Sequence, residues 1–154
     1  SVGYSLSKHL SNTFYDLDKE VEKRFNLSIR DIFIEYGEDL FRKEENKLLK
    51  ELEISSDLIV STGGGIVLSE ENRTILKKNK TYFLEANIED MYERAIKKEN
   101  NRPLLKGMDI TKFKELYIKR RDLYVESATT TINVGKKSIE DLTIEIIENE
   151  KNII

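Results

Sequence analysis

Short β-rich runs alternate with longer stretches of helical periodicity along this chain, and this alternation constrains the fold more than any other feature of the sequence. Each β-rich run is only about five residues long, which is typical of strands buried on both faces. Strands alternating with helices form βα units around a parallel sheet. We therefore expect an α/β fold whose strands are Thr13–Leu17, Asp57–Ser61, Thr81–Glu85 and Thr129–Val134.

Helix starts are indicated by residues whose side-chain oxygen can accept the free N–H groups of a first turn. Four of them lie between or after the expected strands: Ser28, Ser69, Asn87 and Ser138. Gly37 can adopt a positive φ at little cost, so we expect it to end one helix before the next begins, at roughly Glu38–Leu52. The two helices form a helical insertion, about residues 19–52, between the first two strands.

Length and composition bound the class of protein. A chain of 154 residues indicates one domain, 1–154. Its 26 Lys and Arg residues against 29 Asp and Glu argue against a dedicated nucleic-acid binder, because such proteins need excess positive charge. Without cysteine the chain has no disulfide or thiolate metal site, which suits a reducing compartment. No apolar run is long enough for a membrane span, so we expect a cytoplasmic protein without a nucleic-acid or membrane partner.

Three consecutive glycines, Gly63-Gly64-Gly65, directly follow the second expected strand. Ligands of open α/β sheets bind at the carboxyl ends of the strands, and glycines there let a ligand approach the backbone and its N–H groups. A plain strand-to-helix turn is the alternative, but one glycine would be enough for it. We therefore favour a ligand-binding turn.

Two carboxylates, Asp16 and Asp18, lie two residues apart at the end of the first expected strand. An extended chain would point both the same way, and their mutual repulsion would suggest a metal ion or a hydroxyl-rich ligand between them. Alternatively, Asp18 only caps the helix that contains Glu20–Arg24. The two residues by themselves leave both interpretations open.

Arg42 lies in an expected helix, four residues after Glu38 and three before Glu45. A surface ion pair explains this spacing and would contribute little to stability. The functional interpretation is an arginine held by Glu45 so that its guanidinium can bind a substrate carboxylate in a bidentate manner. From the helix alone the surface ion pair is the better explanation.

Positive charge lies on both sides of Pro103, the one proline of the chain. Arg102 precedes it, with Lys98 nearby, and Arg120 and Arg121 follow further along. We expect the segment of about residues 99–112 to be a mobile lid, because cations on a closing lid suit phosphoryl transfer. The alternative for the later cations is an ordinary solvated helix face.

The order and spacing of six motifs over almost the whole chain resemble those of the shikimate kinases. The motifs are Ser1-Val2-Gly3, Asp16-Leu17-Asp18, Phe41-Arg42 with Glu45, Gly63-Gly64-Gly65, Arg102-Pro103-Leu104-Leu105, and Arg120 before Leu123-Tyr124. The resemblance implies a three-layer α/β sandwich around a five-stranded parallel sheet. It also implies transfer of the γ-phosphoryl group of ATP to the 3-hydroxyl of shikimate, with Mg²⁺, by a monomeric enzyme of aromatic amino-acid biosynthesis.

On the acceptor side, the resemblance implies that Asp18 binds the shikimate hydroxyls and orients or deprotonates the attacking one. Arg42 and Arg120 would hold the shikimate carboxylate, with Glu45 holding Arg42. Backbone N–H groups of Gly63, Gly64 and Gly65 would bind the same substrate, Gly64 and Gly65 being the favoured contacts.

On the donor side, the resemblance implies that Asp16 helps to hold Mg²⁺ through water. Arg102 would stabilise the transferred phosphoryl group and contact ATP. Lys98 and the segment Asn133–Lys137 are candidates for adenine binding by position only.

Two departures from the family pattern are present. Asp122 stands where the family has proline, so that its charge would either weaken the grip of Arg120 or face solvent. The phosphate-binding loop of the family, with its lysine and Ser/Thr, and the strand before that loop have no counterpart in the sequence. We expect roughly 10–15 residues with these features to precede Ser1.

Two other functions stay open at this stage. One is a kinase for another small polyol acid, such as gluconate. Asp18, Arg42 and Arg120 disfavour this function, because they fit a compact ring with a carboxylate and vicinal hydroxyls. The other is a non-catalytic domain that binds shikimate or a nucleotide. The residues that precede Ser1 distinguish this non-catalytic domain from an enzyme, because the phosphate-binding loop is expected there.

Overall fold

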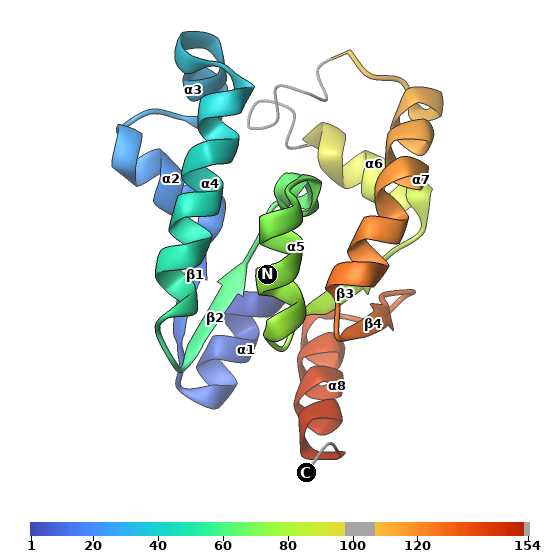
Figure 1. Ribbon diagram of the computed structural model, residues 1–154. Coiled ribbons are helices and arrows are strands. Elements are labelled where there is room, and N and C mark those ends of the chain that lie inside the picture. Colours follow the sequence, from blue (N-terminus) through green and yellow to red (C-terminus); the bar gives the residue numbers. More distant parts are fainter. Residues whose placement is uncertain (98–106, 153–154) are drawn as a thin grey trace.

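The computed structural model describes residues 1–97 and 107–152 (Figure 1). Lys98, Arg102 and most of the expected lid lie outside the described residues. In chain order the elements are α1 (Val2–Leu10), β1 (Thr13–Asp16), α2 (Leu17–Phe25), α3 (Ile29–Tyr36), α4 (Glu38–Glu53), β2 (Leu58–Ser61), the 3₁₀ helix η1 (Gly64–Leu68), α5 (Glu70–Lys78), β3 (Tyr82–Glu85), α6 (Ile88–Lys97), α7 (Ile110–Ser127), β4 (Thr130–Asn133) and α8 (Ile139–Asn152).

All four predicted helix caps are confirmed. Each side-chain oxygen accepts a hydrogen bond from the backbone N–H three residues on, over distances from 2.8 to 3.3 Å; the caps are Ser28, Ser69, Asn87 and Ser138. Gly37 has a φ of 86° and separates α3 from α4, as expected. These local signals therefore set the helical insertion of α2, α3 and α4 that stands beside the sheet.

The four predicted strands are present, each slightly shorter than expected, and they form two parallel pairs. β1 pairs with β2 from Thr13↔Leu58 to Asp16↔Ser61. β3 pairs with β4 from Tyr82↔Thr130 to Glu85↔Asn133. Among the described residues no ladder joins one pair to the other, so the sheet is divided between β2 and β3.

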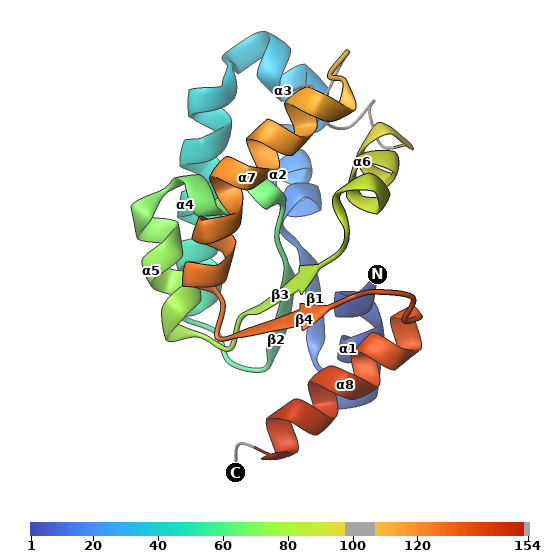
Figure 2. The ribbon, with the colours of Figure 1, turned by 90° about the vertical axis from the view of Figure 1, so that its right-hand side faces the viewer.

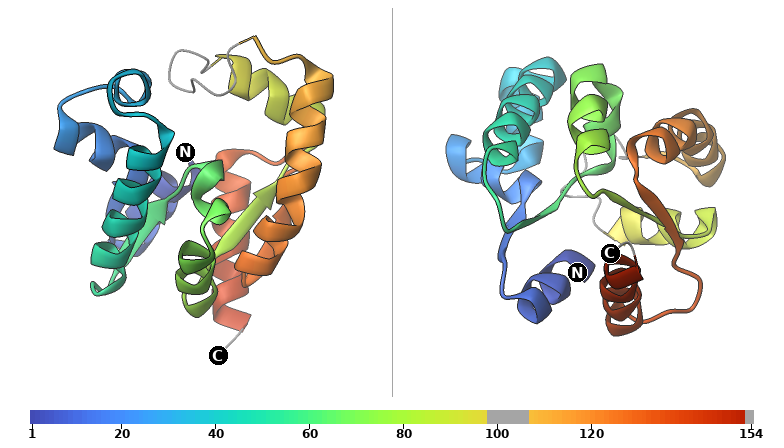
Figure 3. Two further views of the ribbon diagram at one scale, coloured as in Figure 1. Left: turned by 45° about the horizontal axis from the view of Figure 1, so that its top comes forward. Right: turned by 60° about the horizontal axis from the view of Figure 1, so that its bottom comes forward.

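Helices cover both faces of the strands. α4, α5 and α7 lie side by side on one face, while α1 packs against α8 on the other (Figures 2 and 3). The core is correspondingly divided into two apolar clusters, one around Leu17, Ile32 and Leu76, the other around Leu6 and Ile132. The expected three-layer α/β sandwich is confirmed.

A cavity of about 1190 Å³ separates the two strand pairs. Ile59 and Val60 of β2 line one side of it, Phe83 and Leu84 of β3 line the other, and Leu6 of α1 lies along it. The described residues form four strands, whereas the resemblance implies five. The strand and phosphate-binding loop expected before Ser1 stay a prediction. No helix in the described ranges has the length and apolar character needed to cross a bilayer.

The helical insertion depends on a fully buried residue of α3. Ile32 has no exposed surface, whereas Ile34 on the same helix is 70% exposed. Truncating a buried isoleucine removes apolar contacts and leaves a cavity, so Ile32→Ala should lower the free energy of unfolding by about 2–5 kcal/mol. Chemical denaturation measures this change, and Ile34→Ala is the matched control. Equal effects of the two substitutions would contradict this packing.

Candidate active site

The predicted acceptor residues meet at one end of the cavity, beyond the carboxyl ends of β1 and β2. Asp18, Arg42, the three glycines and Arg120 all line it. Residues separated by about a hundred positions in sequence are thus brought together by parallel strands that end at the same edge. Asp16 does not line this cavity.

The predicted geometry of the two aspartates is wrong. β1 ends at Asp16, and α2 already begins at Leu17, so Asp18 belongs to the first helical turn and the two carboxylates do not share an extended strand. Asp16, and not Asp18, is the helix cap, since its Oδ1 accepts a hydrogen bond from the N–H of Lys19 over 3.3 Å. The cap forms as soon as the pairing with β2 ends, because the first N–H groups of a helix need acceptors.

Each glycine of the triplet faces a different side chain. A Cβ atom on Gly63 would lie 3.2 and 3.3 Å from the carboxylate oxygens of Asp18, and one on Gly64 would lie 3.0 Å from the hydroxyl of Tyr124. On Gly65 it would overlap with the guanidinium of Arg42. None of the three has a positive φ, so the glycines are required for space and not for a turn conformation.

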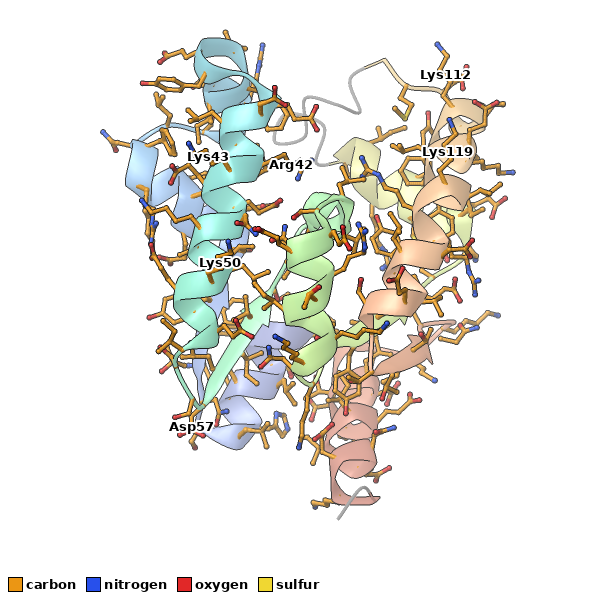
Figure 4. The ribbon with its side chains drawn as sticks, in the orientation of Figure 1. Arg42, Lys43, Lys50, Asp57, Lys112 and Lys119 are labelled. Carbon is orange, nitrogen blue, oxygen red and sulfur yellow. The ribbon has the colours of Figure 1, made fainter. Side chains whose placement is uncertain are left out.

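Arg42 reaches from α4 toward the middle of the molecule (Figure 4). Its Nη1 donates hydrogen bonds to both carboxylate oxygens of Glu45, over 3.1 and 3.3 Å, and its Nε donates to Glu38 over 3.4 Å. Glu45 is 1% exposed. The explanation by a surface ion pair is therefore wrong, because one partner is buried beneath the cavity.

The electrostatic surroundings of Glu45 follow from this burial. Loss of hydration raises the pKa of its carboxyl group, and the nearby charge of Asp18 raises it further. The charge and hydrogen bonds of Arg42 act in the opposite direction, as does the charge of Arg120. A single buried carboxylate therefore interacts with three of the predicted site residues.

Arg120 approaches the cavity from α7. Its Nε is buried and has no hydrogen-bond partner among the described residues. Asp122 is exposed, and two residues further along a helix lie on a nearly opposite face, so its charge faces solvent and not the cavity. The site thus has guanidinium groups from α4 and α7 and a carboxylate from α2, a combination that suits a ligand with one carboxylate and several hydroxyl groups.

Two anchoring contacts of α7 are not evident from the sequence. The hydroxyl of Tyr124 donates to the carbonyl oxygen of Gly64 over 2.9 Å. Glu85, at the end of β3, accepts hydrogen bonds from Tyr117 over 2.8 Å and from Nε of Arg121 over 2.5 Å. The sequence pattern that could have indicated these contacts is a helical spacing, which places Tyr117, Arg121 and Tyr124 near one face of α7.

The described residues fit a metal ion only as Mg²⁺ held largely by water. They contain no cluster of three or more His, Cys, Asp or Glu residues able to hold a metal. Mg²⁺ commonly takes one or two carboxylates and keeps several waters. One carboxylate oxygen of Asp16 accepts the helix-cap hydrogen bond. The other oxygen could accept a hydrogen bond from a water molecule bound to Mg²⁺. For a nucleotide, the described ranges hold no glycine-rich loop followed by Lys and Ser/Thr.

This fold and pocket are typical of an α/β enzyme that binds a small molecule. The family model for shikimate kinase matches residues 1–151. Shikimate kinase of Nitrosospira multiformis is 42% identical over 140 residues, which cover 90% of this chain and 71% of that protein. Shikimate kinase of Dictyoglomus turgidum is 40% identical over 153 residues, which cover 96% and 88%.

Solved structures agree with these sequence relatives. The structure of shikimate kinase from Acinetobacter baumannii in complex with shikimate is similar with a TM-score of 0.92 at 32% identity, over 98% of this chain and 85% of that one. That of shikimate kinase from Aquifex aeolicus has a TM-score of 0.83 at 33% identity, over 98% and 87%. The chain belongs to the shikimate kinase family.

The raised pKa of Glu45 predicts a pH-dependent difference in stability. The folded protein binds this proton more tightly than the unfolded chain, so the contribution of Glu45 is complete below the ordinary glutamate pKa and is lost as pH rises through the raised one. As pH rises from the ordinary glutamate pKa through the raised one, the free energy of unfolding of the wild-type protein should therefore fall relative to that of Glu45→Gln. Denaturation at a series of pH values measures the difference. Glu38→Gln, at the exposed partner of Arg42, is the control, and parallel curves for wild type and Glu45→Gln would contradict the burial of this charge.

Proposed function

We propose that this protein transfers the γ-phosphoryl group of ATP to the 3-hydroxyl group of shikimate, a step of aromatic amino-acid biosynthesis. The observation that carries the proposal is the meeting of the guanidinium groups of Arg42 and Arg120 with the carboxylate of Asp18 in one cavity beside Gly63-Gly64-Gly65. Membership of the shikimate kinase family supports the same substrate.

In this proposal Arg42 and Arg120 bind the carboxylate of shikimate from two sides. Guanidinium groups suit this role because their planar forks match the two oxygens of a carboxylate. Glu45 holds Arg42 in place through hydrogen bonds to Nη1, so the guanidinium is already oriented before substrate arrives. The unpartnered Nε of Arg120 is a further donor for the bound anion.

Asp18 is proposed to bind shikimate hydroxyl groups and to accept the proton of the attacking 3-hydroxyl. A carboxylate is a suitable acceptor for vicinal hydroxyls, and Asp18 lies against Gly63, where the substrate would also contact the backbone of the turn. Positioning of the hydroxyl is the main contribution of the protein, since phosphoryl transfer depends largely on alignment and charge stabilisation.

The proposal also covers the phosphoryl donor. ATP would supply the phosphoryl group, and Asp16 would contribute one water-mediated contact to Mg²⁺. Arg102 and Lys98 keep their proposed roles toward ATP, but both lie outside the described residues. A monomeric state and a cytoplasmic location are further parts of the proposal, supported by the family resemblance and the absence of cysteine.

The decisive experiment is a coupled assay of ADP release by the full expressed protein, with and without shikimate. Shikimate-dependent release is expected. Release with gluconate instead would favour a kinase of another polyol acid. Binding of shikimate without any ADP release would favour a non-catalytic domain. No observation on the described residues supports that function.

Arg42→Ala should raise the KM for shikimate roughly tenfold to a hundredfold, because it removes a charge-assisted hydrogen-bond partner of the substrate carboxylate. The KM for ATP should change little. Initial rates at varied concentrations of each substrate measure both constants. An equal loss of affinity for shikimate and ATP would contradict the proposed carboxylate contact.

Gly65→Ala should have a similar effect without removing any charged group. The new Cβ atom would occupy the place of the Arg42 guanidinium, which must then leave its position beside the turn. We expect the KM for shikimate to rise by roughly tenfold. Gly64→Ala is the comparison, since its Cβ atom would lie 3.0 Å from the Tyr124 hydroxyl and leave Arg42 in place. A larger effect of Gly64→Ala on this KM would refute the explanation.

A further inference from the structure

Side chains of α5 hold the backbone that follows the glycine triplet, and Tyr124 holds the triplet itself through the carbonyl oxygen of Gly64. Nδ2 of Asn72 donates a hydrogen bond to the carbonyl oxygen of Ile66 over 3.0 Å. Nη1 of the next residue, Arg73, donates to the carbonyl oxygen of Val67 over 2.8 Å. Successive carbonyl groups of η1 are therefore bonded to one helix.

Asn72 also connects this turn to the helix that carries Arg42. Its Oδ1 accepts a hydrogen bond from Nδ2 of Asn46 over 2.6 Å. Asn46 lies on α4 directly after Glu45 and about one helical turn after Arg42. α4 thus meets the turn twice, once where Gly65 faces the Arg42 guanidinium and once through the amide of Asn72.

The amide of Asn72 has a fixed direction. It is 1% exposed, so each of its polar ends needs a partner within the protein. The oxygen is directed at a donor on α4 and the nitrogen at a carbonyl group of η1. Because an amide has an acceptor at one end and donors at the other, turning it over would break both bonds.

We propose that Asn72 is a positioning residue for the acceptor substrate: it fixes the Gly63–Gly65 turn relative to α4, so that the turn and the Arg42 guanidinium contact the same bound molecule. The inference rests on the proposed function, because that molecule is the carboxylate-bearing acceptor. Asn72 itself need not touch it.

Asn72→Ala and Asn46→Ala test the connection from its two ends. Each should raise the KM for shikimate, and the Kd for shikimate measured by calorimetry without nucleotide, on the order of threefold to tenfold. The KM for ATP should stay unchanged. The double variant should be no worse than Asn72→Ala alone, because Asn46 reaches the turn through Asn72, whereas its other hydrogen-bond partner, Glu71, has an exposed side chain.

Asn46→Asp distinguishes positioning from packing. Aspartate has nearly the size of asparagine but offers no donor, so it can bond Asn72 only if the amide turns over and abandons Ile66. Its Kd for shikimate should therefore exceed that of Asn46→Ala. Lys50→Ala is the matched control: Lys50 (Figure 4) bonds Glu71 between the same two helices over 2.8 Å, at exposed positions, and its loss should leave the Kd unchanged.

The outcomes separate this inference from the proposed function. A wild-type protein that neither binds shikimate nor releases ADP with it overturns both. An active wild type whose Asn46 and Asn72 variants keep the wild-type Kd for shikimate, even with a lower melting temperature, overturns the positioning role alone. An equal rise in Kd for Lys50→Ala also overturns it, because any loss of contact between α4 and α5 would then have the same effect.

Discussion

A carboxylate with almost no contact with water, that of Glu45, sets the arrangement of the site around it. Burying such a charge is costly unless a cation and hydrogen bonds compensate. Arg42 provides both from within α4, and Arg120 adds a second positive charge from α7. The two helices must therefore approach the same point, and the turn between them must leave room for a guanidinium, which Gly65 does. Glu45 thereby orients Arg42 through hydrogen bonds and attracts Arg120 through its charge.

Much of the fold could be predicted from the sequence because it depends on local signals. Ser28, Ser69, Asn87 and Ser138 cap helices through bonds to residues only three positions away, and such spacings are visible in the chain itself. The four strands were equally evident from short β-rich runs. The separation of these strands into two pairs was not predicted, since periodicity carries no information on which strands are neighbours.

The site was harder to predict, because its geometry depends on contacts between distant elements. The strand was expected to continue through Leu17, but pairing with β2 ends at Asp16, and that one-residue difference moved Asp18 into a helix. The burial of Glu45 could not be distinguished from a surface ion pair within α4 alone. Asn72 resembled an ordinary first-turn residue, although its spacing of three and four residues from the buried Ile75 and Leu76 places it on the apolar face of α5. Polar residues on such a face point to partners elsewhere in the fold.

The packing of α7 has a consequence for how the site can change. This helix follows β3 in the chain, but it contacts α5 and η1, which belong to the half of the molecule with the glycine turn. Its Tyr124 packs against the same apolar cluster as Leu17 of α2. The helices that carry Asp18, Arg42 and Arg120 therefore share one core. A substitution that loosens this core moves all three side chains together, so the stability of this half and the geometry of the site are coupled.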